Sequence, residues 1–288
     1  DIHSPHLDML AKQGRCFLRA YCQEAICSPS RASLLTGSRP DTIGVIENRA
    51  YFRDLNPQIV TLPQHFITHG YTAVYSGKIF HGRMTDDQHS WNYKPNRKGL
   101  TPPANPGGNA LPENQRIYAE NKDRMVTLYG EISSRGLIHG PAFEAAQVED
   151  DGYVDGYNTS VAIQTLDELV QQDKPWFLAL GFSRPHLPFH APKRYFDLYN
   201  PEEIQLTKFS EPPQDGASMG LHASFELRTR HDIPKSGPIN KSLSRKLLHA
   251  YYACVSYVDA QIGRVIASLE KNKVRENTII CLLYTSDA

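Results

Sequence analysis

Apolar side chains recur along this chain with two different spacings, which predict alternating helices and strands. Spacings of three and four residues predict one helix over 155–172 and a long one over 242–273. The apolar positions of the long helix are Leu247, Leu248, Tyr251, Val255, Val258, Ile262, Val265, Ile266 and Leu269. The aliphatic and aromatic residues of 71–76 and the apolar run 176–182 are instead typical of buried parallel strands. Helices between buried strands indicate an α/β fold, with a mixed, mostly parallel sheet sandwiched between helices.

Proline, glycine and capping residues mark the ends of two shorter helices. Ser4 and Pro5 start a helix that Gly14 stops, which is the usual arrangement of an N-cap, a proline in the first turn and a glycine at the end. A second helix is predicted over 62–69, where Gly70 closes it before the strand that follows. Both boundaries strengthen the alternating pattern.

Two further strands are predicted over 16–22 and 278–284 from their apolar residues. Between them, residues 82–150 are rich in proline, glycine and asparagine. We expect a long, loop-rich excursion with little regular structure there, because such residues interrupt both helices and strands.

Composition narrows the classes of function only slightly. The 288 residues include 31 basic and 31 acidic side chains, so the formal net charge is zero and no nucleic-acid partner is expected. No apolar run approaches the length of about 20 residues that a membrane helix needs, and no signal peptide opens the sequence. The five cysteines do not form a dense disulfide framework.

The string Ala25–Gly37 (AICSPSRASLLTG) carries a cysteine in an unusual place. Cys27 stands two residues before Pro29 and four before Arg31, and the residues after it predict a helix that Gly37 ends. Residue 27 would therefore lie at or near a helix N-terminus, where backbone N–H groups and the helix dipole favour an anion. A covalent nucleophile suits that place. The alternative is a buried structural cysteine.

Charged and imidazole side chains follow both of the buried strands. Lys78 and His81 come just after the strand at 71–76, where α/β proteins place groups that bind ligands. A lysine there is usually only a solvated charge when it is taken alone. His186 follows the strand at 176–182, between two prolines that form a stiff loop. Its alternative role is to cap that loop through local hydrogen bonds.

Together these strings resemble the signatures of the type I sulfatases, whose fold resembles that of alkaline phosphatase. Residues 25–37 match the first signature, and Gly70–His81 resembles the second, although Ala73 stands where serine or threonine is usual. The resemblance covers most of the chain and is weakest between about residues 92 and 150.

Three further segments are similar to the iduronate-2-sulfatase branch of that family. They are the Pro185–Phe189 turn (PHLPF), Thr85-Asp86-Asp87 with Ser90-Trp91, and Tyr251–Arg264. The resemblance to this branch implies that the substrate is a sulfated sugar, with a uronate-type glycan as one candidate.

In this family a formylglycine-generating enzyme oxidises the signature cysteine to formylglycine, whose hydrate attacks the sulfur of a sulfate ester. The resemblance implies that residue 27 supplies this nucleophile. It also implies that Arg31, one helical turn away, faces residue 27 and steadies the hydrate or the metal-bound carboxylates. Lys78 would bind a sulfate oxygen as a point charge. His81 would take a proton from the second hydroxyl, so that sulfate is expelled.

Substrate binding is expected from residues outside the two signatures. By the resemblance, His186 would contact the sulfate or protonate the leaving alcohol. Trp91, with Tyr93 and Arg97, would stack on and grip the sugar, although packing of the excursion is an equal alternative for all three. The excursion and residues 208–240 would shape the pocket.

The resemblance also implies a divalent cation, Ca²⁺, with residue 27 and Asp287 among its ligands. Family members begin with a strand that carries paired aspartates and, after a strand like 278–284, continue into an Asp-His/Asn-Gly turn. We therefore expect residues 1–288 to be a sulfatase catalytic domain that is truncated at both ends. Such an ion takes about six oxygen ligands, so Asp287 alone would not hold it well.

Hydrolysis of a sulfate ester is the expected function, and two alternatives stay open. One is a phosphomonoester or phosphonate hydrolase of the same superfamily, and the other is a non-catalytic module that binds sulfated glycans. A cysteine phosphatase is disfavoured because only three residues separate Cys27 from Arg31. Family resemblance implies export to a periplasmic, extracellular or lysosomal compartment.

Overall fold

The computed structural model describes residues 2–82, 85–86, 88–134, 137–209, 211–217 and 224–283. Contacts within the chain divide it into two compact units. Unit 1 consists of Asp1–Ser4, Pro102–Val154 and Arg184–Asp259, and unit 2 of Pro5–Thr101, Asp155–Ser183 and Ala260–Ala288. The chain passes from one unit to the other several times, so each unit is assembled from segments that lie far apart in the sequence.

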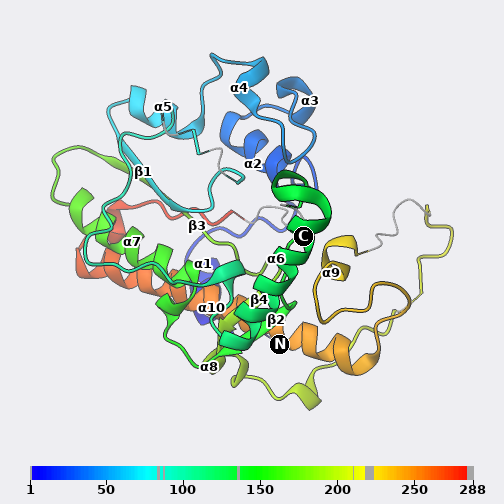
Figure 1. Cartoon of the computed structure of the whole chain (residues 1–288). Coiled ribbons are helices and arrows are strands. Elements are labelled where there is room, and N and C mark those ends of the chain that lie inside the picture. Colours follow the sequence, from blue (N-terminus) through cyan, green and yellow to red (C-terminus); the bar gives the residue numbers. More distant parts are fainter. Residues whose placement is uncertain are drawn as a thin grey trace. The chain divides into compact units, whose positions relative to one another are not determined.

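Helices predominate among the described residues (Figure 1). The α-helices are α1 (Pro5–Gln13), α2 (Cys27–Thr36), α3 (Pro40–Ile43), α4 (Phe52–Leu55), α5 (Leu62–Thr68), α6 (Pro112–Ser133), α7 (Val154–Leu169), α8 (Lys193–Phe196), α9 (Phe225–Arg228) and α10 (Lys241–Lys271). The strands are β1 (Thr72–Gly77), β2 (Phe143–Ala146), β3 (Trp176–Gly181) and β4 (Phe189–Pro192). Short 3₁₀ turns are η1 (Pro106–Gly108), η2 (Asp150–Gly152), η3 (Pro201–Glu203) and η5 (Arg275–Asn277). Within the described ranges, no helix combines the length and the apolar character that crossing a membrane requires.

Unit 2 contains β1 and β3, which pair in parallel from Thr72 opposite Trp176 to Gly77 opposite Gly181. Both runs were predicted as buried strands; the structure confirms that they are strands, with β1 mostly buried and β3 half-buried up to Gly181. Helix α5 precedes β1 and packs against it. The α5 side chain Phe66 stacks on Phe177 of β3, with ring centroids 4.7 Å apart. Parallel pairing brings the carboxyl ends of both strands to the same edge, where Lys78 follows β1.

The core of unit 2 joins the first half of the chain to β1. Its buried residues are Ala32, Leu35, Ile43, Val45, Phe52, Ala73, Phe80 and Trp91. The rings of Phe52 and Phe80 stack with their centroids 5.6 Å apart, and Trp91 contacts Phe80 edge to face. Figure 1 shows α2, α3 and α4 in blue and light blue beside one another within this unit. The core therefore ties α2 and α4 to the residues that follow β1.

Unit 1 contains β2 and β4, which also pair in parallel, with Glu144 opposite His190. Both side chains are buried. Glu144 accepts hydrogen bonds from the backbone N–H of Ala110 at 2.6 Å and from the Tyr153 hydroxyl at 2.6 Å. Burial, together with the charges of two arginines, lowers the pKa of His190 to about 3, so this imidazole is neutral near pH 7.

The structure confirms four predicted helices. Helix α1 ends just before Gly14, and α5 begins with a capping box in which Thr61 and Gln64 bind each other's backbone N–H groups. The two apolar stripes become α7 and α10. These helices were predictable because each has local signals for its ends or a continuous apolar face.

Other expectations were wrong. The stretch 16–22 is not a strand: its side chains are exposed, with Leu18 at 90%, and no described strand pairs with it. Residues 278–283 also form no ladder. The sequence predicted a mixed, mostly parallel sheet, whereas the described ladders are all parallel and form two two-stranded sheets. A strand needs a partner as well as apolar residues, and these two stretches have none within the described part of the chain.

The expected loop-rich excursion over 82–150 was also partly wrong. It contains α6, a helix of 22 residues that is interrupted at Gly130, and the strand β2. Helix α6 buries no residue among those described, so it has no apolar stripe that would reveal it. Pro112 in its first turn and a run of good helix formers explain why it forms.

Candidate active site

Helix α2 begins at Cys27, as the sequence predicts. Gly37 ends the helix in the left-handed conformation (φ 67°), with its N–H bound to the carbonyl of Ser33. Cys27 is 8% exposed and lies in the first turn. The predicted placement of residue 27 at a helix N-terminus is therefore confirmed.

The first turn of α2 uses several of its N–H groups internally. The N–H of Ser28 donates to Oδ1 of Asn48 at 3.0 Å, and the N–H of Ser30 donates to the carbonyl of Ile26 at 3.1 Å. Pro29 has no N–H. Two N–H groups near the start of α2 therefore already have acceptors within the chain.

Lys78 places a cationic side chain at the start of α2. Its Nζ lies 3.8 Å from Sγ of Cys27, within hydrogen-bonding distance of sulfur. The lysine follows β1 directly, and its backbone N–H donates to the carbonyl of Gly181 at 2.9 Å, which continues the β1–β3 ladder by one residue. The predicted nucleophile and the predicted sulfate-binding lysine thus meet at the carboxyl end of the sheet, although 51 residues separate them.

Two glycines allow β1 and β3 to approach this closely. A Cβ on Gly77 would lie 2.0 Å from the carbonyl oxygen of Gly181, and a Cβ on Gly181 would lie 1.9 Å from the carbonyl oxygen of Lys78. Gly77 also has a φ of 76°, which disfavours any other residue. The position of Lys78 therefore requires glycine, which has no Cβ, at both 77 and 181.

Arg31 contacts the backbone that follows β1. Nη1 of this buried arginine donates to the carbonyls of Lys78 at 2.8 Å and Ile79 at 3.1 Å. The guanidinium thus connects the first two turns of α2 to the backbone that carries the lysine. Four residues separate Arg31 from Cys27, so both lie on one face of the helix.

His81 lies near the same helix. A cavity of about 10 Å³, enough for about one water molecule, is lined by Ser28, Ala32, Ala50, Tyr51, Phe52, Phe80 and His81. The imidazole therefore shares this small space with Ser28, the residue next to Cys27. Cys27, Arg31, Lys78 and His81 all belong to unit 2.

His186 belongs to unit 1 and lies in the loop between β3 and β4. Its Nδ1 lies 2.7 Å from the carbonyl of Leu187, and its Nε2 lies 3.6 Å from Oε2 of Glu226. The short local contact places the Nδ1 proton toward Leu187, which leaves Nε2 to face the carboxylate. Sequence reasoning did not find Glu226, because nothing near it in the sequence relates it to His186.

Two further predicted site residues have less support. Trp91 is 6% exposed, packs near Tyr75, Phe80 and Phe177, and donates from Nε1 to the carbonyl of Thr85 at 2.8 Å. A ring in this position offers no face to a sugar, so the packing alternative holds for Trp91 and we do not retain it as a substrate-binding residue. Asp287 lies outside the described residues.

The described residues do not form a site for a divalent cation. No group of three or more histidine, cysteine, aspartate or glutamate side chains comes together in the part of the chain that the structure describes. A calcium ion takes six to eight oxygen ligands. These residues alone therefore do not fit the ion that the family resemblance implies, and we derive no step from it.

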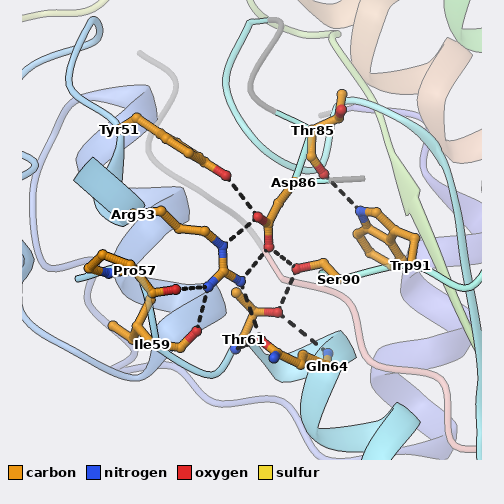
Figure 2. Close-up of polar contacts among 10 residues, drawn as sticks. All are labelled: Tyr51, Arg53, Pro57, Ile59, Thr61, Gln64, Thr85, Asp86, Ser90 and Trp91. Carbon is orange, nitrogen blue, oxygen red and sulfur yellow. Dashed lines mark hydrogen bonds and ion pairs between the residues drawn. The ribbon is translucent and has the colours of Figure 1, made fainter. Parts of the chain in front are cut away.

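Unit 2 also contains a buried ion pair between Arg53 and Asp86, which the sequence did not predict (Figure 2). Nε of Arg53 donates to Oδ1 of Asp86 at 2.6 Å, and Nη2 donates to Oδ2 at 2.7 Å. Burial raises the pKa of the Asp86 carboxyl, but hydrogen bonds from Arg53, Ser90 and Tyr51 outweigh it and hold that pKa below its usual value. Burial and the hydrogen bond to Asp86 raise the pKa of Tyr51 to about 12.

Comparisons with known proteins identify the family to which the chain is similar. The family model described as Sulfatase matches residues 2–287. Iduronate 2-sulfatase of Homo sapiens is 32% identical over 297 residues, and that of Mus musculus is 31% identical over 300 residues. Each alignment covers 99% of this chain and 50% of the relative, so the chain spans about half the length of the curated relatives it matches.

A solved structure supports the fold. The crystal structure of phosphonate monoester hydrolase of Agrobacterium radiobacter superposes with a TM-score of 0.58 at 23% identity, covering 96% of this chain and 56% of the other. At this identity the similarity establishes the fold alone, which is the alkaline-phosphatase-like arrangement of helices and parallel strands. With the family model matching nearly all of its length, the chain belongs to the sulfatase family.

Proposed function

We propose that this chain carries catalytic groups of a sulfuric ester hydrolase that removes sulfate from a sulfated sugar. The observation that carries the proposal is the contact between Nζ of Lys78 and Sγ of Cys27 at the start of α2. It unites a covalent nucleophile with a fixed positive charge, which is what attack on an anionic ester requires. Membership of the sulfatase family supports the same reaction.

The nucleophile is residue 27 after conversion. A formylglycine-generating enzyme would oxidise Cys27 to formylglycine, whose hydrate supplies the hydroxyl that attacks sulfur. A new bond joins sulfur to the hydrate oxygen while the bond from sulfur to the alcohol oxygen breaks, and the alcohol oxygen takes up a proton. Loss of a proton from the second hydroxyl of residue 27 then breaks the C–O bond that carries the sulfate, which re-forms the aldehyde and expels sulfate. The products are the free sugar hydroxyl and inorganic sulfate.

The other residues of the site bind the sulfate or move protons. The Lys78 ammonium binds a peripheral sulfate oxygen and offsets the charge that grows there. His81 accepts a proton at an imidazole nitrogen. Arg31 acts on the substrate indirectly, because its Nη1 holds the carbonyls of Lys78 and Ile79.

We assign one of two roles to His186: it contacts the sulfate, or it protonates the leaving alcohol. Its Nε2 lies 3.6 Å from Oε2 of Glu226, so this nitrogen has a polar partner on the side away from Leu187. The variant His186→Ala is expected to lower turnover of an alkyl sulfate, whose alcohol is a poor leaving group. Unchanged turnover of that substrate would remove His186 from the site.

A sulfated uronate is the substrate class we favour, because the similar curated relatives are iduronate 2-sulfatases. The second candidate is a phosphonate or phosphate monoester, which the fold of a phosphonate monoester hydrolase supports. A phosphate monoester carries close to two negative charges at pH 7, whereas a sulfate monoester carries one. The Lys78 ammonium beside residue 27 suits the smaller charge better, which disfavours a phosphate monoester. A phosphonate monoester carries one negative charge, as a sulfate monoester does, so charge does not separate these two.

The proposal is tested by co-expressing the protein with a formylglycine-generating enzyme and measuring the mass of the peptide that contains residue 27. Conversion of the thiol to the aldehyde lowers that mass by about 18 Da. The converted protein should hydrolyse sulfated uronates faster than the matching phosphate esters, and Cys27→Ala should abolish both the mass change and the turnover.

Two outcomes would contradict this function. Faster hydrolysis of phosphonate or phosphate esters would favour the second candidate. An unmodified Cys27 in a protein that still binds sulfated glycans would instead indicate the non-catalytic binding module.

A further inference from the structure

Asp86 belongs to the Thr85-Asp86-Asp87 string, for which the proposed chemistry has no use, yet it is the centre of a buried polar network. Figure 2 shows its carboxylate between Tyr51, Arg53 and Ser90. The Tyr51 hydroxyl donates to Oδ1 at 2.7 Å, and the Ser90 hydroxyl donates to Oδ2. The side chain of Asp86 is 0% exposed, so it cannot touch a substrate. Any effect it has on catalysis must pass through other residues.

Arg53 uses all five of its N–H groups in this network. Besides the two bonds to Asp86, Nη1 donates to the carbonyls of Pro57 at 3.1 Å and Ile59 at 2.8 Å, and Nη2 donates to Oε1 of Gln64 at 3.3 Å. The guanidinium therefore fixes Asp86 against the segment between α4 and α5. A buried ion pair contributes little net stability compared with apolar packing, so its value lies more in the geometry it enforces.

The segment that Asp86 belongs to runs from Lys78 to Asn92 and so includes the lysine of the proposed site. The chain leaves β1 at Lys78 and returns to it at Asn92, whose N–H donates to the carbonyl of Ala73 at 2.9 Å. Oδ1 of Asn92 also accepts from the N–H of Ala73 at 2.7 Å. The segment is thus closed at its base, and Asp86 attaches it to Arg53 between the two ends.

Tyr51 provides a second connection to the active site. Its hydroxyl is held by Asp86, and the residue lines the cavity that His81 and Ser28 also line. The neighbouring Phe52 stacks on Phe80, which precedes His81. A shift of Asp86 would therefore reach both His81 and the start of α2 through packed side chains.

We propose that Asp86 is a positioning residue, which holds Lys78 and His81 against the nucleophile helix through Arg53 and Tyr51. The inference rests on the proposed function, since it assigns catalytic roles to that lysine and histidine. A misplacement of about 1 Å at a reacting centre can lower a rate by about 100-fold. The network therefore affects the rate without contacting the substrate.

The test is a double-mutant cycle in the converted protein. Asp86→Asn keeps the size of the side chain and removes its charge, and we expect kcat/KM for a sulfate ester to fall at least about tenfold. In a Lys78→Ala background the same substitution should lower kcat/KM by a smaller factor than in the wild type, because one of the two residues through which it acts is already absent. Additive effects, or full activity of Asp86→Asn, would overturn the proposal.

A second variant and a matched control guard against simple unfolding. Tyr51→Phe keeps the ring and removes only the hydroxyl bound to Asp86, and it should show the same non-additivity with a smaller loss. Arg264→Lys weakens another partly buried network in unit 2, in which this arginine binds Gln261 and Ser160 at 2.7 Å each. Arg264→Lys should leave kcat/KM unchanged. Equal losses in the control and in Asp86→Asn would overturn the proposal.

Hydrogen exchange gives a result that does not depend on activity. In the unconverted protein, Asp86→Asn should speed amide exchange in residues 78–82 and leave the exchange of α7 unchanged. If the wild type hydrolyses no sulfate ester, the proposed function fails, but this measurement still tests the positioning role. Unchanged exchange at 78–82 would overturn that role even in an active enzyme.

Discussion

Arg31 donates from Nη1 to the carbonyl oxygen of Lys78 at 2.8 Å, so one guanidinium couples the nucleophile helix to the backbone of the lysine beside it. The same atom also binds the next carbonyl, that of Ile79, at 3.1 Å. This contact brings two signatures of the family, which lie far apart in the sequence, into one rigid unit. Its consequence is that changes in the backbone after β1 and changes in α2 should have similar effects on activity.

Replacing Arg31 should therefore affect both stability and activity. Arg31→Ala leaves two buried carbonyls without their charged donor, and we expect it to lower the free energy of unfolding by about 1.5–3 kcal/mol. Urea denaturation measures this loss, and steady-state kinetics should show a fall in kcat/KM of at least about tenfold. Arg31→Lys keeps the charge and should retain more stability than Arg31→Ala. Equal stability of the two variants would contradict the role of the guanidinium.

A methyl group on Gly181 should displace Lys78. The new Cβ would lie within 2.8 Å of three backbone atoms of Lys78, and backbone cannot move aside as a flexible side chain can. Gly181→Ala is expected to cost about 1–3 kcal/mol of unfolding free energy and most of the activity. Thermal unfolding and kinetics measure the two effects.

Gly14→Ala is the matched control, because its Cβ would meet a single backbone atom, the carbonyl of Leu10, at 3.0 Å. It should lose little activity. A Gly181→Ala variant as active as this control would contradict the close approach of β1 and β3.

The Arg53–Asp86 pair should stabilise the protein in a way that depends on pH. The pKa of Asp86 is lower in the folded chain than the usual value near 3.8, so its stabilising effect is present above pH about 4 and is lost as the pH falls through the folded pKa. The difference in unfolding free energy between wild type and Asp86→Asn should therefore be largest near pH 7. It should shrink as the pH is lowered toward 3. A difference that is constant over this range would contradict the assignment.

His190 should make unit 1 sensitive to acid over a different range. Its pKa is about 3 in the folded chain and about 6.5 when unfolded, so only the unfolded state takes up this proton between these values. Its contribution to stability is full above pH 6.5 and is lost as the pH falls toward 3. Urea denaturation from pH 7 to 4 should show that His190→Gln reduces the slope of stability against pH by up to about 1.4 kcal/mol per unit. Identical slopes would contradict a buried neutral imidazole.

The sequence predicted elements whose signals are local. Helix α2 was predictable from Gly37 at its end, and α10 from apolar residues that recur over 31 positions. Strands β1 and β3 were predictable from their aliphatic and aromatic residues. Helix α6 was not predictable, since its residues pack against no core and leave no periodic pattern.

The candidate site was predictable only as far as its motifs extend. Cys27, Lys78 and His81 stand in signature strings, but the 3.8 Å contact between the first two depends on how two distant segments fold together. Asn48, which binds the N–H of Ser28, stands in no such string. The Arg53–Asp86 pair spans 33 residues, and no local spacing relates a buried arginine to its carboxylate.

The hydrogen bonds between Asn92 and Ala73 help to protect an edge of β1 against pairing with a second molecule. Strand β1 pairs with β3 on one side, and on the other the N–H and the carbonyl of Ala73 are both bound by Asn92. An open strand edge invites pairing with a second molecule and so promotes aggregation. By imitating a neighbouring strand at this position, Asn92 removes one place at which such pairing could begin.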